Sequence, residues 1–151
     1  MGLFDKPQKK GQPVGPQPDE IREQRIEEVR HLTEKVLYDI ADLLAGNDPT
    51  FETYVAPQVA QWLRQSVAPF LATRDAMRPN YGDYAALHVE GNLVDFTQPI
   101  DAVVEFDDQS VRETADGTVI PQPKRRMRLS MTIDPSCRVI QRLSIEQVQQ
   151  P

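Results

Sequence analysis

The chain has 151 residues, a formal net charge of −6 and a pI of about 4.9, with 39% apolar and 26% charged residues. This is the composition of one globular domain, and its acidic balance argues against general attraction to nucleic acid or anionic lipid. The single cysteine, Cys137, excludes an intrachain disulfide, and no stretch has the apolar length of a membrane span, so we expect a cytoplasmic protein without an integral membrane segment.

Residues 1–18 differ in composition from the rest of the chain. They contain four prolines and three lysines but few apolar side chains, so we expect a disordered, proline-rich tail or tether. Near its start, two large apolar residues stand beside two charged ones, a form typical of short docking segments. The candidate partner-binding residues are therefore Leu3, Phe4, Asp5 and Lys6. The alternative is an unstructured start without a role.

Residues 19–151 have the pattern of a single α+β domain, which begins with helices. Apolar residues recur at steps of three and four from Ile21 to Leu44, which predicts an amphipathic helix of about seven turns that ends at Gly46. A second apolar face over residues 59–71 predicts another helix, which Pro69 should kink or split. We expect Trp62, on this face, to lie in the core.

After residue 80 the apolar period changes from helical spacing to two, which predicts an antiparallel meander of about four strands. Gly91-Asn92 and Asp116-Gly117 are candidate two-residue turns. Val94 and Phe96 have even numbers, like the apolar residues that follow them from Ile100 to Phe106, so we expect all of them on the same face of the sheet. The predicted fold is a long N-terminal amphipathic helix and further helices, packed on one face of a curved four-stranded meander.

The basic run "KRRMR", residues 124–128, has two interpretations: a phosphate-binding patch or the polar face of a strand. If a hairpin closes at Asp116-Gly117, the sequence numbers of any two residues that face each other across it add up to 233. This register pairs Val104 with Leu129 on an apolar face and Glu105 with Arg128 on the other. A slip by one residue would spoil both faces. We therefore favour the strand interpretation and expect no nucleic-acid partner, with a bulge or loosened loop near Pro121 and Pro123.

Residues that carry chemistry are few. No glycine-rich phosphate loop occurs, and His31, His88 and Cys137 are too sparse for a zinc site without convergence on a carboxylate, so we expect no metal and no cofactor. We interpret Cys137 as a surface thiol in a hairpin turn. His88, with Asp101 as a nearby acid, is the candidate for general base chemistry; the alternative is a solvated strand residue.

One long helix, helices with an aromatic face and a meander whose last hairpin reads "RRMRLSMTIDPSCRVIQRLSIE" together resemble the cone-shaped nuclear transport factor 2-like superfold over residues 19–148. The resemblance lies in the order of the elements. It implies either of two function classes, because the superfold holds cyclases and isomerases with an acid or histidine in the cone as well as non-catalytic docking domains.

Two functional hypotheses follow. In the first, the chain is a non-catalytic interaction or scaffold domain that docks a protein partner or forms a homo-oligomer, tethered by its tail. In the second, a pocket between helices and sheet binds an unknown small molecule, and the protein is an isomerase-like or cyclase-like enzyme that uses His88 and Asp101. We favour the first, because no catalytic constellation is evident in the sequence.

Overall fold

The computed structural model describes residue 15 and residues 17–149. The predicted docking segment, Leu3 to Lys6, lies outside the described residues. The fold is α+β, as expected, with a long N-terminal helix and antiparallel sheet. None of the helices within residues 17–149 has both the length and the apolar character needed to cross a membrane.

The helices lie in the first half of the chain. Helix α1 spans Pro18–Leu44, the 3-10 helix η1 spans Phe51–Thr53, and α2 spans Pro57–Leu71. The start of α1 is capped because the backbone N–H of Gln17 donates to Glu20 Oε1 at 3.2 Å. Gly46 follows the helix at φ +98, a left-handed conformation that glycine adopts without strain.

The strands form two antiparallel sheets. In the larger, the order is β2-β4-β7-β8 and β3 also pairs with β4; in the smaller, the order is β1-β5-β6. Their bounds are β1 Ala76–Arg78, β2 Tyr81–Gly82, β3 His88–Glu90, β4 Ile100–Asp108, β5 Val111–Glu113, β6 Val119–Pro121, β7 Arg125–Ile133 and β8 Ile140–Gln147. The smaller sheet was not predicted.

The predicted register between β4 and β7 is confirmed. Val104 faces Leu129 and Glu105 faces Arg128, and every pair from Ile100–Ile133 to Asp108–Arg125 sums to 233. The β5–β6 hairpin belongs to the smaller sheet, and the numbers of its facing residues sum to 232, one less than in the β4–β7 pair. The N–H of Thr114 donates to Thr118 O, so three residues, 115–117, close the turn, with Gly117 at φ +90, and the predicted two-residue turn at Asp116-Gly117 is wrong. Residues 122–124 belong to no strand and separate β6 from β7, which agrees with the expected loosened loop.

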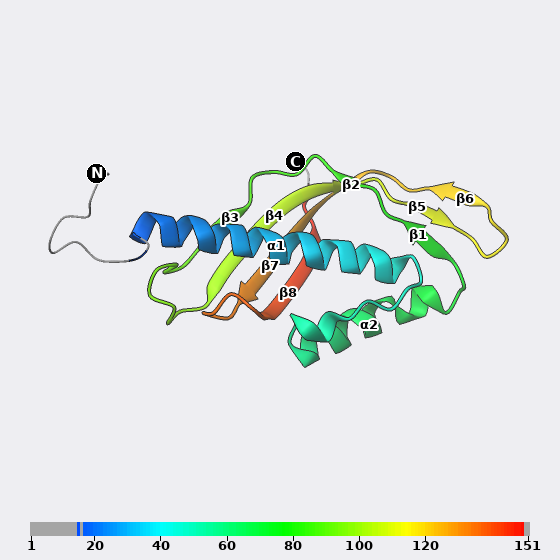
Figure 1. The fold of residues 1–151 in the computed structure, drawn as a ribbon. Helices are drawn as coiled ribbons and strands as arrows, with labels where there is room; N and C mark the ends of the chain where they lie inside the picture. Colours follow the sequence, from blue (N-terminus) through cyan, green and yellow to red (C-terminus); the bar gives the residue numbers. More distant parts are fainter. Residues whose placement is uncertain (1–14, 16, 150–151) are drawn as a thin grey trace, which may run out of the picture.

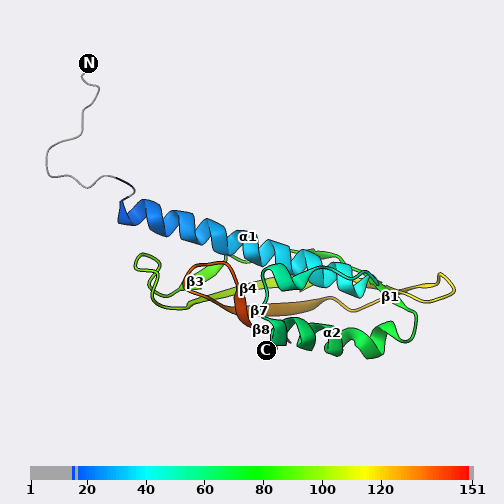
Figure 2. The same cartoon turned by 60° about the horizontal axis from the view of Figure 1, so that its bottom comes forward.

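The core lies between the sheet and α1. On β4 and β7, residues of one parity are buried, and they form one cluster with α1 residues such as Val29 and Val36. Figures 1 and 2 both place α1 along one side of the sheet that β3, β4, β7 and β8 form. The start of α2 lies beside β8, because Val55 forms a parallel bridge with Ile140.

Several local expectations were wrong. Trp62 is 45% exposed, since the buried stripe of α2 consists of Val59, Ala60 and Leu63. Helix α2 continues through Pro69 without a split.

The predicted turn at Gly91-Asn92 is also wrong, because residues 91–99 form a longer loop between β3 and β4. Asn92 Oδ1 accepts hydrogen bonds from the N–H groups of Val94 and Asp95. This loop puts Leu93 in the core and leaves Phe96 half exposed. The predicted alternation of apolar and polar residues therefore does not continue through the loop.

Candidate functional site

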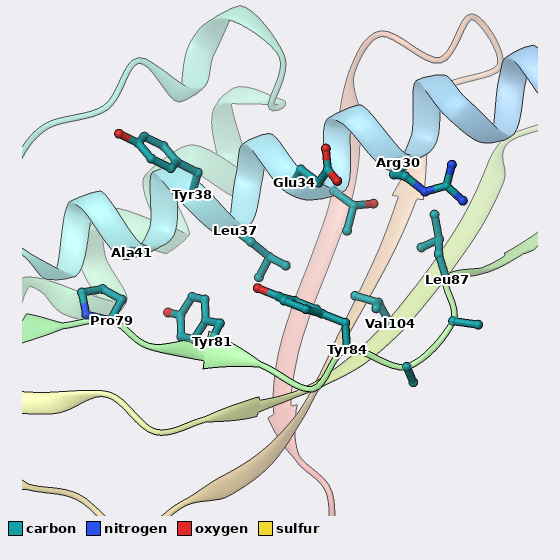
Figure 3. A pocket seen from close by; sticks show the side chains of 13 residues that line it. Arg30, Glu34, Leu37, Tyr38, Ala41, Pro79, Tyr81, Tyr84, Leu87 and Val104 are labelled. Carbon is teal, nitrogen blue, oxygen red and sulfur yellow. The ribbon is translucent and has the colours of Figure 1, made fainter.

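An open cavity of about 700 Å³ lies between α1 and the segment 79–87. We call it the tyrosine groove. Its principal lining residues are Tyr38, Tyr81, Tyr84, Leu37, Leu87 and Val104, with Arg30 and Glu34 as its charged groups. Figure 3 shows Tyr81 and Tyr84 on the segment that faces the helix, with Leu37 on the helix side, Pro79 near one end and Leu87 near the other.

The groove exists because the edge of the sheet is interrupted. Strands β2 and β3 both pair with β4, but residues 83–87 between them belong to no strand. Asp83 turns the chain at φ +50, in the left-handed region that aspartate tolerates better than most residues. Among residues 83–87, only Ala85 has a backbone N–H that bonds to β4; it donates to Glu105 O at 2.9 Å. The segment thus leaves the sheet edge and forms a wall opposite α1.

A buried aromatic ring positions two of the tyrosines. The ring centroid of Phe106 on β4 lies 5.1 Å from that of Tyr81 and 5.7 Å from that of Tyr84, in tilted arrangements that aromatic pairs favour. Phe106 is only 2% exposed, whereas Tyr84 is 52% exposed and Tyr38, on α1, is 72% exposed. The groove therefore presents large, rigid side chains that the fold itself does not cover.

Tyr81 and Tyr84 are neutral over the physiological range. Burial raises the pKa of Tyr81 to about 12, with a further contribution from the charge of Asp108. Burial also raises the pKa of Tyr84, and the negative charge of Glu34 acts in the same direction. Their hydroxyl groups are therefore hydrogen-bond donors and acceptors at neutral pH, and not proton-accepting phenolates.

The two charged residues of the groove differ in their pairing. Arg30 forms an ion pair with Glu27 at 2.6 Å, one turn away on α1. Within residues 17–149, Glu34 forms no ion pair or side-chain hydrogen bond, and it is exposed. The uncompensated charge in the groove is thus negative, and it lies beside aromatic surface.

His88 and Asp101 lie elsewhere. Both residues are exposed, on the sheet face opposite the buried residues Ala102 and Val104. The Nε2 atom of His88 is 2.9 Å from Glu90 Oε1, and Asp101 accepts a hydrogen bond from the Thr132 hydroxyl at 3.0 Å. Neither His88 nor Asp101 lines the tyrosine groove.

The basic run 124–128 is neutralised by the neighbouring strand. Arg128 contacts Glu105 at 3.0 Å, Arg126 contacts Asp107 at 3.1 Å and Arg125 contacts Asp108 at 2.8 Å. Lys124 lies 3.8 Å from Asp107. The strand interpretation is therefore confirmed, and the run does not form a patch of unpaired positive charge.

The expectation of a surface thiol is wrong. Cys137 lies in the turn between β7 and β8, as predicted, but it is only 7% exposed. The start of α1 covers it, because the Cys137 Sγ lies 4.0 Å from the carbonyl oxygen of Arg25. Burial raises the pKa of the thiol to about 11, and the charge of Glu28 adds to this.

Within the described part of the chain, no three histidine, cysteine, aspartate or glutamate side chains are grouped so that they could hold a metal ion. A scan against protein-family models gives no match for this chain, and a search of curated proteins finds no match either.

Sequence reasoning missed the tyrosines of the groove. The available signal was the "PNYGDY" segment, residues 79–84, which places two tyrosines and a glycine directly after a proline turn and before the first clear alternation. A second signal was Tyr38, which stands on the polar side of an amphipathic helix. Neither signal indicates that the two segments meet.

Proposed function

We propose that the chain is a non-catalytic protein-interaction domain, in which the tyrosine groove docks a short segment of a partner protein. The observation that carries this proposal is the pair of exposed tyrosines, Tyr38 on α1 and Tyr84 on the facing segment, beside an open apolar groove. Tyrosine is enriched among the residues that dominate binding energy at protein interfaces, since it combines a large apolar body with a hydrogen-bonding end.

The chemistry of the groove defines the segment that it takes. The apolar walls suit an aromatic or branched aliphatic side chain, and the uncompensated carboxylate of Glu34 suits a lysine or arginine next to it. Since Arg30 is already paired with Glu27, it does not cancel this preference. The proposed ligand is therefore a peptide segment with a large apolar residue adjacent to a basic one.

A small molecule is the second candidate, because the volume of the groove lies within the usual range of ligand pockets. Binding of a small molecule in the groove would not imply catalysis by His88 and Asp101, since these residues lie on the other face of the sheet from the groove. A molecule bound in the groove would contact tyrosines and Glu34.

The proposal includes the finer features that the sequence predicted. Residues 1–18 serve as a proline-rich tether, and Leu3, Phe4, Asp5 and Lys6 contact a partner as a second docking segment. Residues 19–151 act as one cytoplasmic accessory domain of the cone-shaped superfold, whose helices cover one face of the curved meander. The alternation of buried and exposed residues on β4 and β7 supports a sheet with one covered face.

Selection of peptides from a phage-displayed random library on the full-length protein tests the groove. We expect the enriched sequences to share a large apolar residue next to lysine or arginine. Binding of a synthetic enriched peptide, measured by fluorescence anisotropy, should weaken about fivefold or more in Tyr84→Ala, because truncation of a central interface aromatic often costs above about 1 kcal/mol. Glu34→Gln should weaken only peptides that carry the basic residue.

Trp62→Ala is the matched control, because Trp62 is a similarly exposed aromatic residue outside the groove. It should leave peptide affinity unchanged. The proposal fails if no peptide is enriched, or if the enriched peptides are sensitive to Trp62→Ala and insensitive to Tyr84→Ala. A small molecule that co-purifies with the protein and occupies the groove at Tyr84 would favour the second candidate.

A further inference from the structure

Strand β8 forms an edge of the larger sheet. It pairs with β7 on one side, and on the other side only its first residue, Ile140, is bonded, to Tyr54 and Ala56. A register shift next to Ile140 marks the end of this covered part. On the side away from β7, the remainder of the strand, residues 141–147, has no neighbouring strand among the described residues.

The free backbone groups of this edge can be assigned. The N–H of Val148 donates to Arg126 O at 2.8 Å, which continues the register between β7 and β8. Since bonded residues alternate along an antiparallel strand, the even-numbered residues of β8 beyond the register shift bond to β7. The N–H and C=O groups of Leu143, Ile145 and Gln147 therefore point away from the sheet and are available to another strand.

Beyond the register shift at its start, this edge lacks the usual protection. Edge strands are commonly protected by lysine, proline, a bulge or a short length, because a row of unpaired N–H and C=O groups pairs readily with another chain. Residues 141–147 read "QRLSIEQ", with neither lysine nor proline. The edge of the smaller sheet, by contrast, is only three residues long and ends in Pro121.

We propose that β8 pairs with β8 of a second copy of this chain, antiparallel, about a two-fold axis through Ser144. In this register facing residue numbers sum to 288, so Leu143 faces Ile145 of the second copy and Arg142 faces Glu146 of the second copy. Leu143 and Ile145 point to the core side, since they face Met131 and Leu129 of β7. The two sheets then form one continuous sheet.

Charge and polarity select this register over its neighbours. Arg142 and Glu146 are exposed on the same face. Within residues 17–149 Arg142 forms no ion pair, whereas Glu146 Oε1 lies 3.6 Å from Arg128 of its own chain, a contact that leaves Glu146 Oε2 for a second arginine. The axis through Ser144 gives two Arg142–Glu146 pairs, one on each side. A sum of 290 places Arg142 opposite Val148 and a sum of 286 places it opposite Ser144, so neither of these registers pairs Arg142 with a carboxylate. Only the sum of 288 satisfies both faces.

An exposed aromatic residue lies beside the proposed interface. Trp62 on α2 borders a shallow cavity of about 400 Å³ together with Gln141, Arg142 and Leu143. Because Ile145 of the second copy faces Leu143, it would enter this cavity and contact Trp62. The surface is separate from the tyrosine groove, and the inference does not depend on the function proposed for the groove.

Cysteine cross-linking of the full-length protein tests the register. Facing residues of a non-hydrogen-bonded antiparallel pair have Cα atoms about 4.5 Å apart, which suits a disulfide. Ser144→Cys should therefore form a disulfide-linked dimer under mild oxidation by glutathione. Glu146→Cys is the matched control on the same face; its two copies would lie about 13 Å apart and should not be linked. The natural Cys137 is buried and should not react.

Sedimentation equilibrium tests the charge pairing. We expect the wild-type protein to dimerise, and Arg142→Glu and Glu146→Arg each to raise the dimer dissociation constant about tenfold or more, because two pairs of like charges then meet. The double variant R142E/E146R should recover most of the wild-type affinity. Arg138→Glu, an equal charge change at an exposed position in the turn before β8, should have no effect.

The inference is overturned if the wild-type protein stays monomeric up to roughly millimolar concentration. It is also overturned if a dimer forms but Ser144→Cys and Glu146→Cys are linked equally, or if the dimer is insensitive to Arg142→Glu. Linkage of Ser144→Cys alone, with recovery in the charge swap, establishes the β8 interface.

Discussion

The hydroxyl group of Tyr54 donates a 2.6 Å hydrogen bond to Oδ2 of Asp39, and both side chains are buried. The bond joins α1 to the segment that precedes α2. This segment also bonds to the sheet, because the N–H of Ile140 donates to Tyr54 O. One residue, Tyr54, therefore connects the long helix to the start of β8 through its side chain and its backbone.

Replacement of Tyr54 by phenylalanine should destabilise the fold. It leaves the buried Asp39 carboxylate without its donor, and loss of a hydrogen bond to a charged group costs about 1.5–3 kcal/mol. Urea unfolding at pH 7 measures the change. Tyr38→Phe, which alters an exposed hydroxyl on the same helix, is the control and should change the free energy of unfolding by less than about 0.5 kcal/mol. Equal effects of the two variants would contradict a structural role for the Tyr54–Asp39 bond.

The pairing of Glu105 with Arg128 should contribute a small, measurable coupling energy. The Glu105 and Arg128 side chains are 33% and 39% exposed, so we expect about 0.5 kcal/mol from a double-mutant cycle with Glu105→Gln and Arg128→Gln. Salt should reduce it. The same cycle with Glu105 and the distant Arg138 should give no coupling. A Glu105–Arg128 coupling above about 2 kcal/mol would show that the pair matters for stability far more than for register.

The native protein should protect Cys137 from thiol reagents. Since burial raises the pKa of the Cys137 thiol to about 11, the thiolate fraction at pH 8 is about a hundredfold below that of an ordinary cysteine. Reaction with Ellman's reagent at pH 8 should thus be at least about a hundredfold slower than in the protein unfolded by guanidinium. Rapid, stoichiometric labelling of the native protein would show that the turn opens or that α1 does not cover the thiol.

The β-hairpin was predictable in detail because two independent patterns agree on it. The apolar parity pairs Val104 with Leu129, and the charges pair Glu105 with Arg128, so only one register satisfies both faces. The long helix was predictable for a similar reason, since its apolar stripe repeats over many turns. Redundant local signals of this kind do not require knowledge of tertiary contacts.

The groove and the burial of Cys137 were not predictable, because they depend on contacts between distant segments. The wall of the groove forms where the chain turns at Asp83 and leaves the sheet, and its opposite wall is α1. Cys137 is buried only because the first turns of α1 reach over the β7–β8 turn near Arg25. Phe96 has the parity of a strand residue, but the hydrogen bonds of Asn92 and Asp95 hold its segment as a loop.

Alkaline pH should destabilise the protein partly through Tyr81. Burial raises the pKa of Tyr81 to about 12, so the stability that its neutral form provides is complete below about pH 10, the pKa in the unfolded chain, and is lost as pH rises through about 12. The loss is at most about 3 kcal/mol. Tyr81→Phe keeps the ring beside Phe106 but cannot ionise, so the variant should be close to wild type at pH 7 and more stable than wild type near pH 11.5. Urea unfolding at both pH values measures the difference, and the comparison removes the contribution of other titrating groups. A parallel loss of stability in the two proteins would mean that Tyr81 ionises without penalty and that this part of the groove is open to water.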